Sequence, residues 1–428
     1  MPVLFAKNGR QDSVTFESVR VVDPTQGIDE SLTVRVEEGV VAAIDPAGAP
    51  ANGKVLAPAF VDPHVHLRTP GRENEEDLSS GTRAAAAGGY CASLALPNTE
   101  PVVDSASVLG ALEEQAEREA EIPVGFLAAI TKAQEGAELT EMVELAERGA
   151  AGFTDDGRPV VAPGLLRRAL QYSAAAGRPV AVHCEEPTLS RGGHVHEGVV
   201  SAELGFGGYP SVAESVMVAR DLALAGYEAR PLHLLHLSAG ESVDELRRAR
   251  AAGVPATAEV TPHHLCLTDD AVRSLDPNVK MNPPLRADED RAALIDALLD
   301  ATIEAIATDH APHAREEKEV PFEEAPFGVT GLETAFSALY TQLVEPGVVP
   351  LATLLERMSA GPARIYGLEA PTIAVGAPAN LVLLDLETVW HVDEGSFKSK
   401  SANSWLLGAK LRGRVVQTVA AGKVVHTS

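Results

Sequence analysis

The feature that most constrains this 428-residue chain is a regular alternation of β-like and helix-like segments through its middle. Apolar runs predict eight strands, at residues 56–66, 89–96, 124–131, 152–155, 179–184, 232–237, 255–260 and 305–309. Helix-like stretches separate most of them, for example at residues 107–121, 139–148 and 242–252. Such alternation favours a parallel sheet with helices outside, so eight units predict an α/β fold of the (β/α)8 TIM-barrel type.

The two ends of the chain have a different character. Residues 13–56 contain short β-like runs separated by turn signals such as Glu38-Gly39, and similar runs return at residues 379–385 and 414–426. We interpret the two ends as one small β-sandwich subdomain built from both termini. The predicted domain boundaries therefore place residues 1–56 and 368–428 in this subdomain and residues 57–367 in the barrel.

Charge and cysteine usage exclude some function classes. The formal net charge of −26 argues against nucleic-acid or anionic-membrane binding, because phosphate contacts need clustered Lys and Arg. Apolar stretches are too short and too interrupted by charge for a membrane span, and the first residues lack the apolar core of a signal peptide. Cys91, Cys184 and Cys266 are widely spaced and read as reduced residues, so we expect a cytoplasmic protein.

Metal-ligand side chains lie at the carboxyl ends of five of the eight predicted strands, where a barrel of this type places its chemistry. They are His64 and His66 at the end of the first strand, Asp155 and Asp156 at the fourth, His183 at the fifth, His236 near the end of the sixth and Asp309 at the end of the eighth. Side chains two positions apart on a strand share a face, so His64 and His66 can reach one ion. Each residue alone also fits a buried polar role, but their joint occurrence predicts a metal centre suited to zinc.

Four histidines and two aspartates are more ligands than one tetrahedral ion needs. They suit two ions that share a bridging carboxylate and a bridging hydroxide. Such a pair lowers the pKa of bound water, which supplies a nucleophile at neutral pH, and it polarises a carbonyl under attack. The predicted chemistry is therefore metal-assisted hydrolysis.

Six short motifs in this chain, in the order in which they occur, resemble those of the bacterial class I dihydroorotases, in the amidohydrolase superfamily. The matching segments are Asp62-Pro63-His64-Val65-His66-Leu67-Arg68, Pro97-Asn98-Thr99, Thr154-Asp155-Asp156-Gly157, His183-Cys184-Glu185, Met281-Asn282-Pro283-Pro284-Leu285-Arg286 and Asp309-His310-Ala311-Pro312-His313. The resemblance runs from about residue 14 to residue 426. It implies reversible, zinc-dependent cyclisation of N-carbamoyl-L-aspartate to (S)-dihydroorotate in pyrimidine biosynthesis.

The resemblance also implies a role for each matching residue. The implied metal ligands are His64 and His66 for the first zinc, His183 and His236 for the second, Asp156 as the bridge and Asp309 on the first zinc. Asp309 would also act as general acid and base when the bridging hydroxide attacks the ring amide carbonyl. The implied substrate-binding residues are His66, Arg68, Asn98, Asn282, His313, Phe327 and Gly328. Among them, Arg68 offers a planar fork for a carboxylate.

Two other functions remain open at this point. One is another cyclic amidohydrolase of the hydantoinase or allantoinase type. Those relatives often bridge their metals with a carboxylated lysine after the fourth strand, where this chain has Asp156 and no lysine. The other is a non-catalytic subunit that scaffolds aspartate transcarbamoylase, which is disfavoured because all six ligands are present. The sequence leaves a homo-oligomer and a complex with aspartate transcarbamoylase open as partners.

Overall fold

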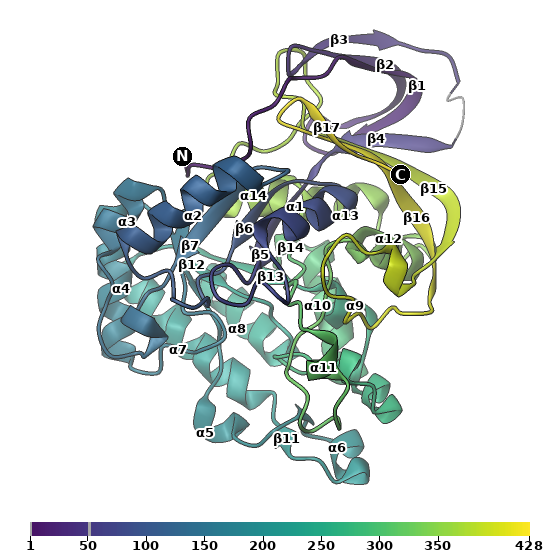
Figure 1. Ribbon diagram of the computed structural model, residues 1–428. Helices are drawn as coiled ribbons and strands as arrows, with labels where there is room; N and C mark the ends of the chain where they lie inside the picture. The colour runs from purple at the N-terminus through teal and green to yellow at the C-terminus, as the bar shows by residue number, and fades with distance from the viewer. Residues whose placement is uncertain (1, 50–52) are drawn as a thin grey trace.

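The structure is a computed structural model that describes residues 2–49 and 53–428, and it is built around two large sheets (Figure 1). Met1 and residues 50–52, which belong to the predicted first part of the terminal subdomain, lie outside the described residues. One sheet has eight strands from the middle of the chain, and the other has seven strands from its two ends. This arrangement confirms the predicted α/β barrel with a β subdomain formed by the terminal segments.

The barrel sheet contains only parallel neighbours and follows the chain order. Its strands are β5 (Phe60–Val65), β6 (Tyr90–Ala95), β7 (Val124–Ala128), β8 (Gly152–Phe153), β9 (Val180–Val182), β12 (Leu232–Leu234), β13 (Ala256–Val260) and β14 (Ala305–Ile306). A parallel bridge between Val65 and His310 connects the first strand to the chain just after the last. The barrel thereby closes, and each strand lies within or at one of the eight predicted segments.

Helices cover the outside of the barrel (Figure 1). The longer ones are α1 (Leu78–Ala87), α2 (Ala106–Glu119), α3 (Met142–Arg148), α4 (Pro163–Ala176), α7 (Val212–Glu228), α8 (Gly240–Ala251), α10 (Asp288–Leu299) and α13 (Leu351–Met358). The helix α2 is amphipathic: it buries Leu109, Leu112 and Ala116, whose spacing of three and four residues lines one helix face. The predicted helices at residues 107–121, 139–148 and 242–252 correspond to α2, α3 and α8.

Shorter elements fill the connections. They are α5 (Pro187–Ser190), β10 (Val195–His196), α6 (Val199–Leu204), β11 (Gly208–Tyr209), α9 (Pro262–Cys266), α11 (Arg315–Lys318), α12 (Ala335–Leu339), α14 (Ala360–Ile365), the 3-10 helices η1 (Lys132–Gln134), η2 (Asp269–Ser274), η3 (Pro277–Val279) and η5 (Glu394–Ser396), and the π-helix η4 (Tyr340–Val344). Strands β10 and β11 pair in parallel as a separate small sheet. Within residues 2–49 and 53–428, no helix combines the length and apolar character needed to cross a membrane.

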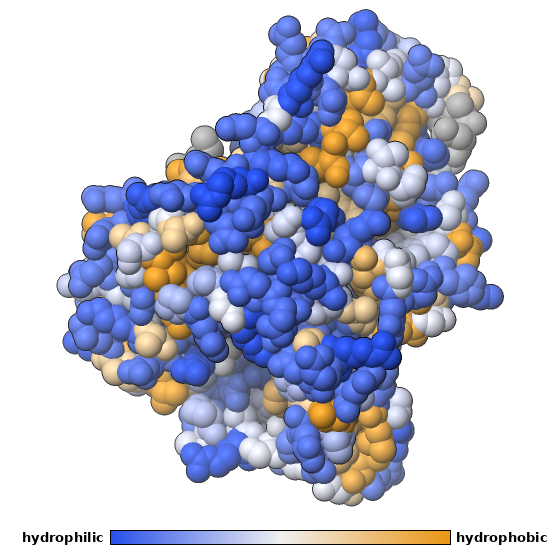
Figure 2. All heavy atoms as spheres, viewed as in Figure 1, coloured by the Kyte–Doolittle hydropathy of each residue, from blue (hydrophilic) through white to orange (hydrophobic). Residues whose placement is uncertain are grey.

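The second sheet joins the two ends of the chain. Its strands, in spatial order, are β17 (Lys423–Thr427), β16 (Lys410–Ala420), β15 (Leu381–His391), β4 (Lys54–Pro58), β1 (Val14–Asp23), β2 (Ile28–Glu37) and β3 (Val40–Pro46). Hydrogen bonds connect all seven into one continuous sheet, and an apolar cluster that includes Phe16, Val34 and Leu381 packs against it. Figure 2 shows hydrophobic residues gathered over this sheet on an otherwise mostly hydrophilic face.

The first predicted strand, residues 56–66, is divided between the two sheets. β4 pairs with β1 and β15 in the terminal sheet, whereas β5 begins the barrel. Between them, the Ala59 N–H donates to the Asn380 carbonyl at 3.0 Å. Pro58 has no N–H to continue a ladder, which is consistent with the break at this point. The terminal sheet is therefore covalently adjacent to the strand that carries His64.

Candidate metal centre and adjoining pocket

The structure brings the six predicted metal ligands together at the carboxyl ends of the barrel strands. These residues are His64 on β5, His66 just after it, Asp156 after β8, His183 after β9, His236 after β12 and Asp309 after β14. All six side chains are buried. Ligand atoms of His64, Asp156 and His236 lie within 4.8 Å of one another, as do those of His64, His66 and Asp309. The described residues can therefore hold metal ions at this end of the barrel.

Asp156 lies between two pairs of histidines. Its Oδ2 atom is 3.4 Å from His64 Nε2 and 3.5 Å from His66 Nε2. Its Oδ1 atom is 3.2 Å from His236 Nε2 and 3.7 Å from His183 Nδ1. Each carboxylate oxygen thus has its own pair of imidazoles, which is the arrangement that a carboxylate shared by two ions requires.

The chemistry of these atoms fits cations. His64 Nε2 is buried without a hydrogen-bond partner, and His183 Nδ1 lies only 3.0 Å from His236 Nε2. Burial alone lowers the pKa of His64, but the carboxylates of Asp156 and Asp309 more than offset this and raise it. The site therefore concentrates negative charge around converging imidazole nitrogens. Nitrogen and carboxylate ligands of this kind suit zinc and similar ions.

Three residues of the site have a backbone conformation that is rare outside glycine. The φ angle is +32° at His236, +47° at Asp309 and +56° at Arg68. Such conformations cost on the order of 1–3 kcal/mol each and persist where the surrounding fold holds them. Their occurrence at two candidate ligands and one pocket residue is typical of a functional site.

A buried carboxylate orients the first histidine. Glu259, on β13, lies with Oε1 2.6 Å from His64 Nδ1, and its Oε2 is 3.0 Å from His233 Nε2. His233 Nδ1 in turn lies 2.9 Å from the Thr257 hydroxyl oxygen. The carboxylate favours the proton on His64 Nδ1 and leaves Nε2 to face the centre. Sequence reasoning missed Glu259, whose one signal was an acidic residue inside the predicted strand at residues 255–260.

Two further polar side chains orient the other histidines. His66 Nδ1 is 2.8 Å from Asn98 Oδ1, so Asn98 contacts a candidate ligand as well as the pocket. His183 Nε2 is 2.9 Å from Glu185 Oε2, which also accepts a hydrogen bond from Asn282 Nδ2 at 3.0 Å. Burial raises the pKa of Glu185, but the His183 contact outweighs it and the pKa falls to about 2. Sequence reasoning assigned no role to Glu185.

The two consecutive aspartates of the Thr154-Asp155-Asp156-Gly157 motif point to different partners. Asp155 Oδ1 accepts hydrogen bonds from the Ile130 and Thr131 backbone N–H groups, at 2.8 and 3.0 Å, and Oδ2 accepts one from the Thr131 hydroxyl. Asp155 therefore ties this loop to the end of β7, while Asp156 faces the histidines. The structure brings the second aspartate, not the first, into the candidate metal centre.

A cavity of about 240 Å³ adjoins the metal centre. It is lined by His66, Arg68, Asn98, Asp156, Gly157, His183, His236, Asn282, Asp309, Ala311, His313, Phe327 and Gly328. All seven residues predicted to bind substrate are among them. They come from distant parts of the chain and meet at the carboxyl end of the barrel, next to five of the six candidate ligands.

The pocket contains one largely enclosed cation, Arg68, and two acceptor atoms without partners. Arg68 Nε donates to the Pro312 carbonyl at 3.0 Å and lies 3.1 Å from Glu75 Oε2. His313 Nε2 donates to the Phe327 carbonyl at 2.8 Å. Burial, followed by the charge of Arg68, lowers the pKa of His313 to about 2, so its imidazole is neutral. His313 Nδ1 and Asn282 Oδ1 are buried without hydrogen-bond partners among the described residues.

Two nearby histidines have structural partners instead. His264 lies with Nδ1 2.7 Å from the Thr261 hydroxyl oxygen, and its Nε2 donates to the Pro283 carbonyl at 3.0 Å. His310 Nε2 lies 3.3 Å from Glu76 Oε2. These contacts place His264 behind the Asn282 segment and His310 behind the end of β14, so both support the site without facing its centre.

Comparisons with known proteins show which family this chain is similar to. A family model described as "Dihydro-orotase-like" matches residues 53–242. The dihydroorotase of Geobacter metallireducens is 44% identical over 415 residues, covering 95% of this chain and 98% of that protein. The dihydroorotase of Anaeromyxobacter dehalogenans is 43% identical over 425 residues, with 97% and 98% covered.

Solved structures extend the likeness to the fold as a whole. An L-hydantoinase (dihydropyrimidinase) from Arthrobacter aurescens has a TM-score of 0.86 and 26% identity, with 96% of each chain covered. A dihydropyrimidinase from Brevibacillus agri has a TM-score of 0.82 at 22% identity, covering 96% of this chain and 95% of that one. At these coverages the shared fold includes both the barrel and the terminal sheet.

Proposed function

This chain belongs to the dihydroorotase family, and from that premise we propose that it interconverts N-carbamoyl-L-aspartate and (S)-dihydroorotate in the pathway to pyrimidines. The observation that carries the proposal is the position of Asp156 between two histidine pairs, beside a pocket that contains Arg68. The first feature supports a two-metal centre, and the second supports an acidic substrate. Both are needed for this reaction, in which an amide bond is made or broken next to a carboxylate.

We assign two zinc ions to the centre. The proposed ligands are His64, His66 and Asp309 for the first ion, His183 and His236 for the second, and Asp156 for both. When bound, the two ions would supply a water-derived nucleophile at neutral pH and polarise the amide carbonyl. The unpartnered His64 Nε2 atom and the close approach of His183 to His236 support this assignment.

Asp309 is the proposed general acid and base. Its Oδ1 atom lies 3.0 Å from His66 Nε2 and 3.4 Å from His64 Nε2, and the side chain lines the pocket. In ring opening, its carboxylate takes up the proton of the attacking water and delivers it to the departing ring nitrogen. In cyclisation the same group removes a proton from the attacking nitrogen and returns it to the leaving oxygen.

Arg68 is the proposed anchor for the substrate carboxylate. Its Nε atom donates to the Pro312 carbonyl and forms an ion pair with Glu75, and the Pro312 contact is the one hydrogen bond of its guanidinium among the described residues. The two terminal nitrogens are therefore available for a bidentate contact with a carboxylate. Asn282 and His313 line the same pocket with unpartnered acceptor atoms, which suit the N–H groups of the ring.

The hydantoinase alternative is the closest competing function, because hydantoinases share this fold. Two features favour dihydroorotate over hydantoin. The fourth barrel strand is followed by Thr154-Asp155-Asp156-Gly157 with no lysine, and Arg68, whose side chain is 9% exposed, places a cation in the pocket. Unsubstituted hydantoin has no carboxylate to pair with that cation, so the two terminal nitrogens of Arg68 would be left without a partner from the substrate.

Metal analysis combined with a substrate panel tests the proposed function. We expect purified protein to hold about two zinc ions per chain and to hydrolyse dihydroorotate, in line with a two-metal mechanism. We expect little or no turnover of hydantoin or allantoin. Zinc-loaded protein that turns over hydantoin and not dihydroorotate would overturn the proposal in favour of the alternative.

We also propose a cytoplasmic location, which the three buried free cysteines support. A homo-oligomer and a complex with aspartate transcarbamoylase are further proposals. A purely scaffolding role is disfavoured, because all six proposed ligand side chains converge at one place. Mixing the purified protein with aspartate transcarbamoylase and measuring the mass of the product tests the complex separately from catalysis.

A further inference from the structure

The chain segment that leads to Phe327 and Gly328 is held by a buried lysine. Lys280 is 2% exposed and lies just before Asn282 in the sequence. Its Nζ atom donates to the backbone carbonyls of Phe322, Glu323 and Ala325, at 2.8, 2.9 and 2.7 Å. An ammonium group has three N–H donors, so all three are used on this one segment.

A second lysine holds the same segment from its other side. Lys318, at the end of α11, is 7% exposed, and its Nζ atom donates to the Pro326 carbonyl at 2.8 Å and to the Pro277 carbonyl at 3.0 Å. Four carbonyls between residues 322 and 326 therefore point at two ammonium groups. Lys318 also couples this segment to η3, which immediately precedes Lys280.

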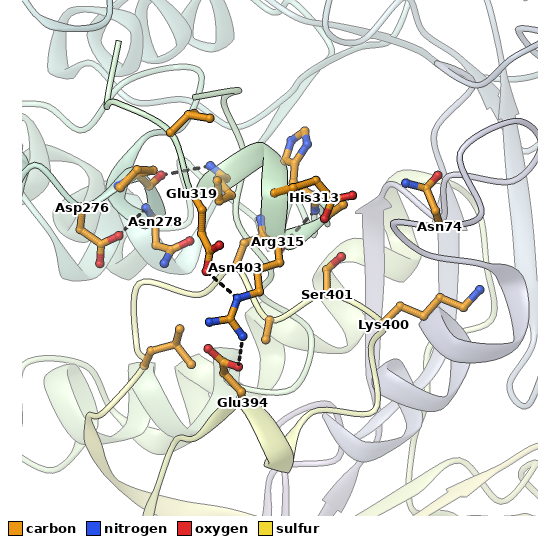
Figure 3. A pocket seen from close by; sticks show the side chains of 17 residues that line it. Asn74, Asp276, Asn278, His313, Arg315, Glu319, Glu394, Lys400, Ser401 and Asn403 are labelled. Carbon is orange, nitrogen blue, oxygen red and sulfur yellow. Dashed lines mark hydrogen bonds and ion pairs between the residues drawn. The ribbon is translucent and has the colours of Figure 1, made fainter. Parts of the chain in front are cut away.

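Lys318 lies in the wall of a second, outer cavity of about 650 Å³, which shares His313 with the pocket (Figure 3). Figure 3 shows Arg315 reaching between Glu319 and Glu394, with which it forms ion pairs at 2.5 and 3.3 Å. The two lysines differ from this arginine, because their hydrogen-bond partners are backbone carbonyls rather than carboxylates. Their positive charges therefore stabilise the backbone conformation of residues 322–326 instead of pairing with acidic side chains.

The two cations compensate an arrangement that is otherwise unfavourable. Carbonyl dipoles that converge on one point repel one another, and buried carbonyls without donors carry a desolvation penalty. An ammonium in their midst satisfies them in the way that a bound metal cation does elsewhere. The rings of Phe322 and Phe327 flank Lys280, with centroids 5.4 and 4.8 Å from Nζ, and add cation–π attraction.

Hydrogen bonds also connect Lys280 and the segment it holds to the wall of the pocket. The Gly328 N–H donates to the Lys280 carbonyl at 2.9 Å, directly after the carbonyls that bind the Lys280 side chain. The Phe327 carbonyl accepts a hydrogen bond from His313 at 2.8 Å. Lys280 thus connects two walls of the pocket, one formed by Asn282 and the other by Phe327 and Gly328.

We propose that Lys280 and Lys318 are positioning residues that serve as internal cations and set the place of the Phe327–Gly328 wall against the candidate metal centre. Neither lysine lines the pocket beside the candidate metal centre. They act through the carbonyls of residues 322–326 and through the hydrogen bond between Lys280 and Gly328. The kinetic part of this inference rests on the proposed function, whereas the structural part does not.

Amide hydrogen exchange tests the structural part without substrate. We expect Lys280→Met to speed exchange in residues 321–328, because three carbonyls lose their donor while an unbranched side chain reaches as far as the position of Cε. Lys423→Met is the matched control, since Lys423 Nζ also donates to a backbone carbonyl, that of Lys7 at 2.7 Å, but in the terminal region. Unchanged exchange of residues 321–328 in a folded Lys280→Met protein would overturn the inference.

Chemical rescue tests the role of the ammonium in catalysis. Lys280→Ala removes the atoms from Cγ to Nζ, which correspond to n-propylammonium. We expect kcat/KM for dihydroorotate to fall by about 10- to 100-fold, mainly through KM, because displacing a binding wall by about 1 Å can have an effect of this size. Added n-propylammonium should restore much of the loss, whereas tetramethylammonium, which has no N–H donors, should not.

The outcomes separate this inference from the proposed function. Equal effects of the two ammonium ions, or a kcat/KM unchanged by Lys280→Ala, would overturn the positioning role. Absence of dihydroorotate turnover in the wild-type protein would count against the proposed function, and the exchange result would still decide the structural part. If Lys280→Ala does not fold, Lys318→Met probes the same segment. Unchanged exchange and KM in that variant would also overturn the inference.

Discussion

Glu259 and His64 form a 2.6 Å contact between Oε1 and Nδ1 inside the barrel, and both side chains are fully buried. The same carboxylate also contacts His233, so it ties two neighbouring strands, β12 and β13, to the histidine on β5. Burial raises the pKa of Glu259, but the charges of His64 and His233 outweigh this and lower it to about 2. Glu259 therefore stays ionised, and its negative charge strengthens His64 as a donor to a cation.

This contact predicts that Glu259→Gln weakens metal binding. The amide keeps the shape of the side chain but removes the charge that orients His64, and losing such a supporting partner reduces metal affinity by about 10- to 100-fold. Competition with a zinc chelator measures the change. Thr257→Val is the control, because the Thr257 hydroxyl contacts His233, which lies beyond Glu259 from the metal centre. Equal zinc retention in wild-type and Glu259→Gln protein would contradict the proposed role.

Asp309→Asn should nearly abolish turnover while the protein remains folded. An amide neither accepts nor delivers a proton, and general acid–base catalysis contributes about 10²- to 10⁴-fold. The measurement is kcat for dihydroorotate, accompanied by zinc content and a circular dichroism spectrum. Zinc content separates loss of the proton carrier from loss of a ligand. Near-normal kcat would remove Asp309 from the acid–base role.

Arg68→Lys should raise KM for dihydroorotate more than it lowers kcat. The substitution keeps the positive charge beside Glu75 but loses the planar pair of donors. A hydrogen bond to a charged group contributes about 1.5–3 kcal/mol, so the loss of one corresponds to a KM about 10- to 100-fold higher. Steady-state kinetics test this. A KM unchanged from wild type would argue that another residue binds the carboxylate.

The catalytic contribution of Lys280 should depend on pH. Burial lowers the pKa of Lys280 to about 8, although the nearby Glu323 charge acts in the other direction; Lys318 and His194 are the other titratable groups coupled to it. Above that pH the neutral amine has two N–H donors for three carbonyls. The ratio of wild-type to Lys280→Met kcat/KM should therefore fall as pH rises from about 7 to about 9.5.

Taking this ratio cancels the ionisations that both proteins share, including those at the metal centre. Only the protonated Lys280 side chain can donate to all three carbonyls. The ratio of wild-type to Lys280→Met kcat/KM should therefore be largest at low pH. A ratio that stays flat, or rises, across the range would show that the third donor does not matter for the position of the segment.

Local patterns in the chain were sufficient for the barrel and for most of the site. Strand and helix periodicities are properties of neighbouring residues, and in a barrel the carboxyl ends of parallel strands meet at one end. His64 and His66 could therefore be placed together with Asp309 without knowing a single contact. The same rule did not separate Asp155 from Asp156, whose orientations depend on hydrogen bonds to the end of β7.

The supporting contacts required the folded molecule, because they join residues that no local pattern connects. Glu259 lies 195 positions from His64, and Lys280 binds carbonyls more than forty positions away. Backbone carbonyls have no sequence signature, so the two-lysine contact with residues 322–326 cannot be read from the chain. Residue types and short spacings determined which side chains carry the chemistry. Closure of the barrel and burial determined what holds each of them in place.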